Sequence, residues 1–162
     1  MNLQEALSMY MGVEAKIKEA VMGQEPARLK PVENAITDRI RSGKKANGDK
    51  IGSYKTYKGN YSNRRVSNYS NWAEERMKKG LQVNYVDFSY TGGLLDALMV
   101  EYREGKVRLV FETIEDEVVA EQLDRMYGLG VFELSEQEEE LLKSEVADMS
   151  RDIINNTIKQ IL

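Results

Sequence analysis

The chain has 162 residues, no cysteine and no histidine, and a formal net charge of −4. Its 41% hydrophobic content is ordinary for one globular domain with a modest core, and no stretch approaches the roughly 20 apolar residues that a membrane-spanning helix needs. The absence of cysteine excludes disulfides and thiolate metal sites, and the first residues lack a basic leader followed by an apolar run, so we expect synthesis in a cytoplasm.

Two helical segments are expected first. Near-helical spacing of apolar side chains predicts a helix over residues 3–22 that Gly23 ends. Those side chains are Leu3, Leu7, Tyr10, Ile17 and Val21. Pro26 suits the first turn of a second helical segment, in which Pro31 introduces a bend or a restart. An apolar stripe then continues to a stop at Gly43, through Val32, Ala35, Ile36 and Ile40.

Residues 44–70 are expected to form a long, exposed basic loop or arm. They are rich in Gly, Asn, Ser and Lys, and their scattered tyrosines follow no sustained period. Loops of this length inside a compact domain are uncommon and often functional. We take the aromatic and cationic side chains of this arm as candidate partner-binding residues: Tyr54, Tyr57, Tyr61, Arg64, Arg65 and Tyr69.

The composition of the arm suits three interpretations. Interleaved tyrosines and cations can stack on bases and neutralise phosphates, as in a nucleic-acid-binding segment. The same residue types are favoured at the core of protein interfaces, so the arm can equally lie on a neighbouring protein. A solvated loop without a partner is the third interpretation.

A helix, a strand and a sharp turn are expected after the arm. Residues 72–77 predict a short helix that ends at Gly80, with cations at the negative end of its dipole: Arg76, Lys78 and Lys79. Alternation over residues 83–90 predicts a strand. Thr91 has the side chain of an N-cap, and we expect positive φ at Gly92 or Gly93, where the chain reverses and sends Leu94, Leu95 and Leu98 inward.

The C-terminal half predicts a hairpin and two helices. Residues 99–103 and 107–111 flank a turn at 104–106, and alternation places Val107, Leu109 and Phe111 on one face. Capping-box spacing predicts helices that begin near Thr113 and Ser135. We expect the apolar residues of the first helix to be Val118, Val119, Leu123, Met126 and Tyr127, and one side of the last helix to carry Leu142, Val146, Met149, Ile153 and Ile161.

These elements predict a single α+β domain over residues 1–162, in which a small, mainly antiparallel sheet packs against helices. Without histidine, catalysis would need carboxylates, lysine or tyrosine, and none forms a recognisable constellation. The carboxylates Glu115-Asp116 and 138–140 could form an acid/base pair or bind a metal, but negative side chains at expected helix starts are accounted for by the helix dipole. We therefore expect neither an enzyme nor a cofactor.

Charge is distributed unevenly along the chain. Residues 39–79 hold twelve Lys or Arg against three acids, a net of +9, whereas residues 112–152 hold three against fourteen, a net of −11. If these segments lie on different faces, the basic segment of one copy can meet the acidic segment of the next, and a closed series of such contacts is a ring. Solvated surfaces with no specific partner explain the same charges.

Motifs in this order resemble a family of small bacteriophage virion-morphogenesis proteins, the head-to-tail joining and tail-completion proteins related to the Mu-type morphogenesis protein. The motifs span roughly residues 40–161: Asn47-Gly48 with Ile51-Gly52-Ser53-Tyr54, then Arg76-Met77-Lys78-Lys79-Gly80, then Val86-Asp87-Phe88 with Thr91-Gly92, and Val131-Phe132-Glu133-Leu134-Ser135 before Glu138. The last motif departs from the pattern of the family, because Gly130-Val131 stand where Arg-Pro is expected.

The resemblance implies a structural protein of a tailed phage virion, made in the host cytoplasm, that forms a homo-oligomeric ring at the head–tail junction. Its partners would be other head, neck or tail proteins, with possible contact to passing DNA and none to a membrane. The alternative is a nucleic-acid-binding accessory protein that uses the same basic, tyrosine-rich arm.

Overall fold

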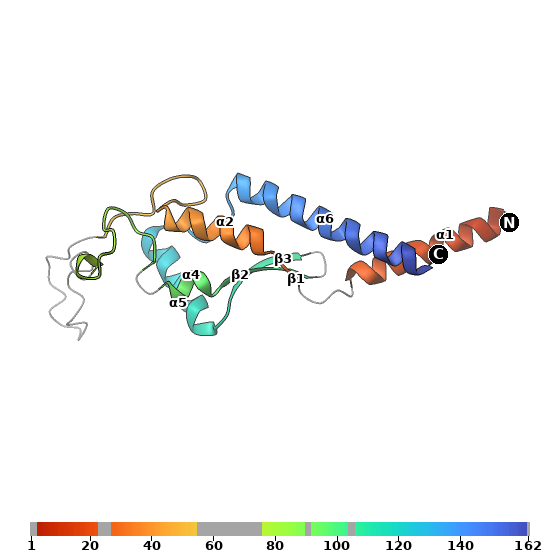
Figure 1. The fold of residues 1–162 in the computed structure, drawn as a ribbon, viewed down its shortest axis with the longest axis horizontal. Coiled ribbons are helices and arrows are strands. Elements are labelled where there is room, and N and C mark those ends of the chain that lie inside the picture. The colour runs from red at the N-terminus through yellow and green to blue at the C-terminus, as the bar shows by residue number, and fades with distance from the viewer. Residues whose placement is uncertain (1–2, 23–26, 55–75, 90–91, 104–105, 162) are drawn as a thin grey trace. The chain divides into compact units, whose positions relative to one another are not determined.

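The structure is a computed structural model that describes residues 3–22, 27–54, 76–89, 92–103 and 106–161. It is an α+β fold with a three-stranded antiparallel sheet in the order β1-β2-β3, as predicted (Figure 1). The elements in chain order are α1 (Leu3–Met22), β1 (Ala27–Arg28), α2 (Lys30–Arg41), α4 (Gly93–Asp96), β2 (Leu98–Arg103), β3 (Lys106–Phe111), α5 (Ile114–Tyr127) and α6 (Glu136–Ile161).

Two compact units share these elements. The first consists of Met1–Glu33, Met99–Val110 and Gln137–Leu162, and the second of Asn34–Leu98 and Phe111–Glu136. Both α2 and β2 contribute residues to each unit. The expected single domain over residues 1–162 therefore stays a prediction.

In the first unit, strand β1 is short because the chain turns into a helix at Leu29. The Leu29 N–H still donates to the Val100 carbonyl of β2 at 2.8 Å, continuing the antiparallel pairing. The Leu29 carbonyl instead accepts from the N–H groups of Val32 and Glu33, which begin α2. The Val100 N–H donates to Glu33 Oε1 at 3.2 Å, so a side-chain carboxylate takes the place of a strand carbonyl.

The Glu33 carboxylate is buried and ionised. Arg28 Nε donates to its Oε1 at 2.7 Å, and Lys30 Nζ lies 2.9 Å from its Oε2. Burial alone would raise the pKa of Glu33, but the hydrogen bonds from Arg28, Lys30 and the Val100 N–H lower it below the ordinary value of 4.5. One charged group thus holds β1, the start of α2 and β2 together.

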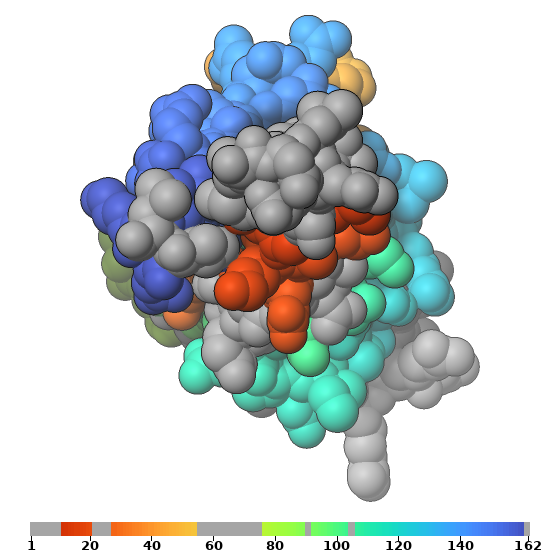
Figure 2. Space-filling view, turned by 90° about the vertical axis from the view of Figure 1, so that its right-hand side faces the viewer, coloured from red at the N-terminus to blue at the C-terminus, as the bar shows by residue number. Residues whose placement is uncertain are grey.

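The helix predicted from Pro26 is wrong at residues 27–28, which form β1. Helix α2 begins at Lys30, and Pro31 occupies its first turn, where a missing N–H breaks no helical hydrogen bond. The predicted apolar stripe of this helix is confirmed by its fully buried residues Val32, Ile36 and Ile40. The predicted helix over residues 3–22 is confirmed as α1, part of which is visible on the face shown in Figure 2.

The strand predicted over residues 83–90 is wrong, since residues 83–89 form none. Phe88 has a left-handed backbone with φ of 51°, which a continuous strand does not accommodate. The turn that follows is as predicted in one respect, because Gly92 has φ of 78°. The N-cap of α4 is Gly92 and not the predicted Thr91. Thr91 itself lies outside the described residues.

The hairpin of β2 and β3 is confirmed, and β2 buries Leu98, Val100 and Tyr102. The residues expected on one face of β3 are Val107, Leu109 and Phe111; Val107 is exposed, and the other two are half-buried. Helix α6 begins directly after Ser135, as predicted, and its four described stripe residues are only half-buried.

Helix α5 packs through only some of the apolar residues that were predicted to pack. Its start is as expected, because Thr113 is the N-cap and accepts from the Asp116 N–H. Leu123 and Tyr127 are half-buried, and the Tyr127 ring contacts that of Phe88, whereas Val118, Val119 and Met126 are exposed and Ala120 is buried. The spacing of apolar residues in α5 therefore identified its packed side only in part.

Gly92→Ala is expected to lower the free energy of unfolding by about 1–2 kcal/mol, because a Cβ disfavours the left-handed backbone at this position. Gly93→Ala is the matched control: Gly93 lies inside α4, so alanine there should be neutral or stabilising by up to about 1 kcal/mol. Urea denaturation of both variants makes the comparison. Equal stability of the two variants would contradict the assigned turn.

Candidate functional site

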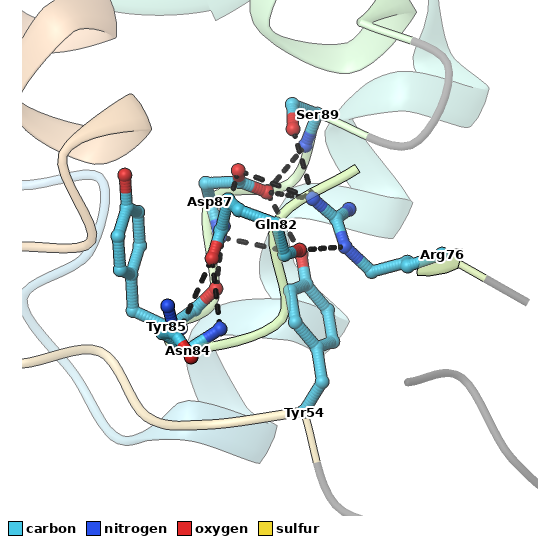
Figure 3. Close-up of polar contacts among 7 residues, drawn as sticks. All are labelled: Tyr54, Arg76, Gln82, Asn84, Tyr85, Asp87 and Ser89. Atoms are coloured by element: carbon cyan, nitrogen blue, oxygen red, sulfur yellow. Dashed lines mark hydrogen bonds and ion pairs between the residues drawn. The ribbon is translucent and has the colours of Figure 1, made fainter. Parts of the chain in front are cut away.

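A buried ion pair between Arg76 and Asp87 lies at the centre of the polar site in the second unit (Figure 3). Arg76 is in a helical turn at residues 76–78 and has no exposed surface. Its Nη2 lies 3.0 Å from Asp87 Oδ1 and also donates to Ser89 Oγ at 3.2 Å. Its Nε donates to the Gln82 carbonyl at 2.8 Å, so the guanidinium joins the helical turn to both following segments.

Three further neighbours complete the surroundings of the Asp87 carboxylate. The Tyr54 hydroxyl and the Ser89 N–H donate to Oδ1, both at 3.0 Å, and Gln82 Nε2 donates to Oδ2 at 2.6 Å. Burial alone would raise the pKa of Asp87, but these hydrogen bonds lower it below the ordinary value of 3.8. The carboxylate is therefore ionised at neutral pH, and its lone pairs are occupied by donors from its own chain.

Tyr54 closes the site from the other side. The Arg76 Cζ lies 4.2 Å from the centre of the Tyr54 ring, within range of a cation–π interaction. Burial raises the pKa of the Tyr54 hydroxyl to about 12, so it remains a hydrogen-bond donor at neutral pH. Arg76 Nη1 is buried without a hydrogen-bond partner among the described residues, which leaves the ring contact as an important part of its surroundings.

Local turns bring these side chains into place. Gln82 folds back on its own loop, since its Oε1 accepts from the N–H groups of Asn84 and Tyr85. The left-handed Phe88 lets the chain reverse so that Ser89 contacts Asp87. The Val86 N–H donates to the Gly52 carbonyl at 2.9 Å, which holds the Tyr54 segment beside the Asp87 segment.

Two further cations of the predicted basic segment also point into the protein. Arg39 donates to the carbonyls of Lys44, Val131 and Glu133, at 3.0, 3.2 and 2.7 Å. Lys45 Nζ donates to the Tyr127 carbonyl at 2.6 Å. Within the second unit, Arg39 and Lys45 thus donate to backbone carbonyls of residues 127–133, which belong to the acidic segment 112–152 of the same chain.

The structure places one of the six predicted partner-binding residues. Tyr54 is half-buried within the site, and the start of the predicted arm packs there as well, with Ile51 only 4% exposed. The other five, Tyr57, Tyr61, Arg64, Arg65 and Tyr69, lie outside the described residues. Arg76, Gln82, Asp87 and Ser89 were not predicted as site residues, although Arg76 and Asp87 each lie inside one of the motifs.

The two groups of carboxylates that could have formed an acid/base pair or a metal site, Glu115-Asp116 and 138–140, make contacts within their own helices. Thr113 Oγ1 donates to the Asp116 carboxylate at 2.7 Å at the start of α5, and Glu140 pairs with Lys143 on the surface of α6. Across the described part of the chain, no group of three or more acidic side chains is placed to hold a metal ion. No helix there combines the length and the apolar character needed to cross a bilayer.

Comparisons of the chain with protein-family models, curated proteins and solved structures found no match. The resemblance in motif order to phage morphogenesis proteins therefore stays a prediction.

Asp87→Asn is expected to lower the free energy of unfolding by about 3–5 kcal/mol, because it leaves the buried Arg76 without its counter-charge. The matched control is Asp96→Asn, which breaks the exposed pair with Arg41 and should cost no more than about 1 kcal/mol. Urea denaturation at neutral pH measures both. A small effect of Asp87→Asn would show that the buried pair is not what holds these segments.

The contribution of Asp87 should also depend on pH in one direction. Since its pKa is lower in the folded state than the ordinary 3.8, its stabilisation is complete above that pH and is lost as the pH falls through the folded-state pKa. The stability difference between the wild type and Asp87→Asn should therefore shrink in acid below about pH 4. A difference that stays constant down to pH 2 would contradict this assignment.

Proposed function

We propose that this chain is a structural virion protein of a tailed bacteriophage, which forms an oligomeric ring at the head–tail junction as a neck or tail-completion protein. One observation carries the proposal: residues from three of the motifs that resemble that family, 11 to 33 positions apart in the sequence, meet in one network around the buried pair of Arg76 and Asp87. Tyr54 comes from the first motif, Arg76 from the second and Asp87 from the third.

This convergence supports the proposal because chance similarities have no reason to contact one another. The motif residues here depend on one another physically: the hydroxyl of the first, the guanidinium of the second and the carboxylate of the third share hydrogen bonds. Apart from Arg76 Nη1, the donors of this network bond to acceptors within it, as in a group that fixes the backbone. A scaffold that presents loops and helices to neighbouring proteins fits this arrangement.

Electron microscopy of the phage that encodes this chain tests the proposal. With the gene intact, the protein should be located at the neck of complete particles. Without it, we expect filled heads and separate tails, because a protein of the junction is needed only for joining. Normal, infectious particles that lack the protein would contradict the proposal.

The predicted arm provides a second test. Arg64→Ala with Arg65→Ala should leave the midpoint of urea unfolding unchanged but reduce the yield of joined particles, if the arm contacts a neighbouring protein. Lys143→Ala with Arg151→Ala is the matched control, because it removes two exposed cations that pair with acids of their own helix, α6. The nucleic-acid-binding alternative predicts instead that the arm variant loses affinity for any DNA sequence, with a salt slope smaller by about two contacts.

Ring formation through charge should weaken with salt. Exposed charges are screened beyond about 8 Å at physiological ionic strength, so contacts between the basic and acidic segments of neighbouring copies should dissociate as salt rises. Sedimentation velocity across a salt series measures the assembled fraction. A ring that is insensitive to salt would show that apolar surface holds the subunits.

A further inference from the structure

Strand β3 is an open edge of the described sheet. It stands at one end of the order β1-β2-β3, and it runs for six residues without proline or glycine. The opposite edge is much shorter, because β1 has only two residues and leads into α2. An edge strand of this kind presents unpaired N–H and C=O groups, which form a template for one further strand.

The outward backbone groups of β3 belong to Val107, Leu109 and Phe111. The Glu112 N–H donates to the Ala97 carbonyl at 2.9 Å, so the residue that follows β3 still points its N–H toward the β2 side. Backbone groups point the same way at every second residue of an antiparallel pair, which leaves Val107, Leu109 and Phe111 facing away from β2. Outside the ladder with β2, no described residue hydrogen-bonds to the main chain of these three. Their N–H and C=O groups are the ones that a further strand would pair.

The side chains of this edge differ between the two faces of the sheet. The three outward residues share one face, on which Val107 is 36% exposed and the other two are half-buried. The opposite face carries the exposed cations Lys106 and Arg108, and the exposed Glu112 lies just beyond the strand. Neither Lys106 nor Glu112 forms an ion pair with another described residue. The edge thus combines apolar side chains with charges of both signs.

We propose that β3 is an interface between two copies of this chain, in which the two β3 strands pair antiparallel about a twofold axis beside Leu109. In this register Leu109 lies opposite Leu109 of the other copy, and Val107 lies opposite Phe111, so every outward N–H and C=O group of the strand is paired. The backbone supplies affinity in such strand addition, and the side chains supply specificity. This twofold contact does not depend on the proposed role in a virion.

The side chains select a second copy of β3 in this register. Lys106 of each copy lies opposite Glu112 of the other, which gives two pairs of opposite charge on one face. A shift of two residues in either direction leaves one outward residue beyond the end of the other strand, and one of these shifts places Arg108 opposite Arg108. Parallel pairing in register sets Lys106 beside Lys106. Cations on an edge strand oppose pairing where like charges meet, and in the proposed register they meet none.

A charge swap tests the register and the partner together. Each single variant, Lys106→Glu or Glu112→Lys, replaces both attractive pairs with like charges and should weaken self-association about tenfold in sedimentation equilibrium. An equimolar mixture of the two variants should associate as the wild type does, because each copy then meets the opposite charge. The two positions lie about 20 Å apart along one strand, so this recovery cannot come from a contact within one chain.

The matched control is Lys143→Glu, which reverses an exposed cation of α6 and should leave association unchanged. Three results would overturn the proposal: single variants that associate as the wild type does, a mixture that shows no recovery, or a wild-type chain that stays monomeric at its highest soluble concentration.

A proline variant tests whether the backbone edge itself is used. Val107→Pro removes an N–H that faces away from β2, so the midpoint of urea unfolding should change little. Self-association should weaken about tenfold or more, because the proline ring obstructs the second strand and two intermolecular hydrogen bonds are lost. Arg108→Pro is the matched control, since it removes an N–H that faces β2 and should lower the midpoint. A folded Val107→Pro variant that associates as the wild type does would also overturn the proposal.

Discussion

The second unit depends on one interaction, the buried ion pair of Arg76 and Asp87. Removing two charges from water is costly, and their mutual attraction offsets the cost only when the remaining donors and acceptors are also satisfied. Here Tyr54 from one segment, and Gln82 and Ser89 from the loop that holds Asp87, supply most of those contacts, while Arg76 Nη1 has no hydrogen-bond partner among the described residues. The segments can therefore adopt these positions only together, which makes the ion pair a source of cooperativity as well as of stability.

Several cations of the basic segment 39–79 bond within their own unit, which reduces the positive charge that this segment presents to solvent. A count along the sequence treats the basic segment as surface, but Arg39 and Lys45 donate to backbone carbonyls of the same unit, and Arg76 is fully buried. Arg41 pairs with Asp96 on the surface of that unit. The charge that residues 39–79 offer to a neighbouring copy is accordingly smaller than their net of +9 suggests.

Sequence patterns predicted the elements whose stability is local. Helix α1, the start of α5 at Thr113, the hairpin and the positive φ at Gly92 follow from spacing, capping and glycine conformation within a few residues. The predicted strand near Asp87 failed because its alternation was overridden by the side chains of distant residues. No local pattern shows that Tyr54 and Arg76 will surround that carboxylate, and the same limit applies to α5, whose packed side is set by residues elsewhere in the unit.

Both units use a buried carboxylate where regular backbone pairing stops. Glu33 accepts the Val100 N–H that β1 is too short to pair, and Asp87 accepts the Ser89 N–H beside the left-handed Phe88. These polar contacts position the chain at points where a larger protein would add strands or apolar core. Because the fold is specified partly in this way, the apolar side chains of α5 need not all be buried within the unit. Among the described residues, Ile114 and Met126 are left on the surface of α5, 77% and 70% exposed.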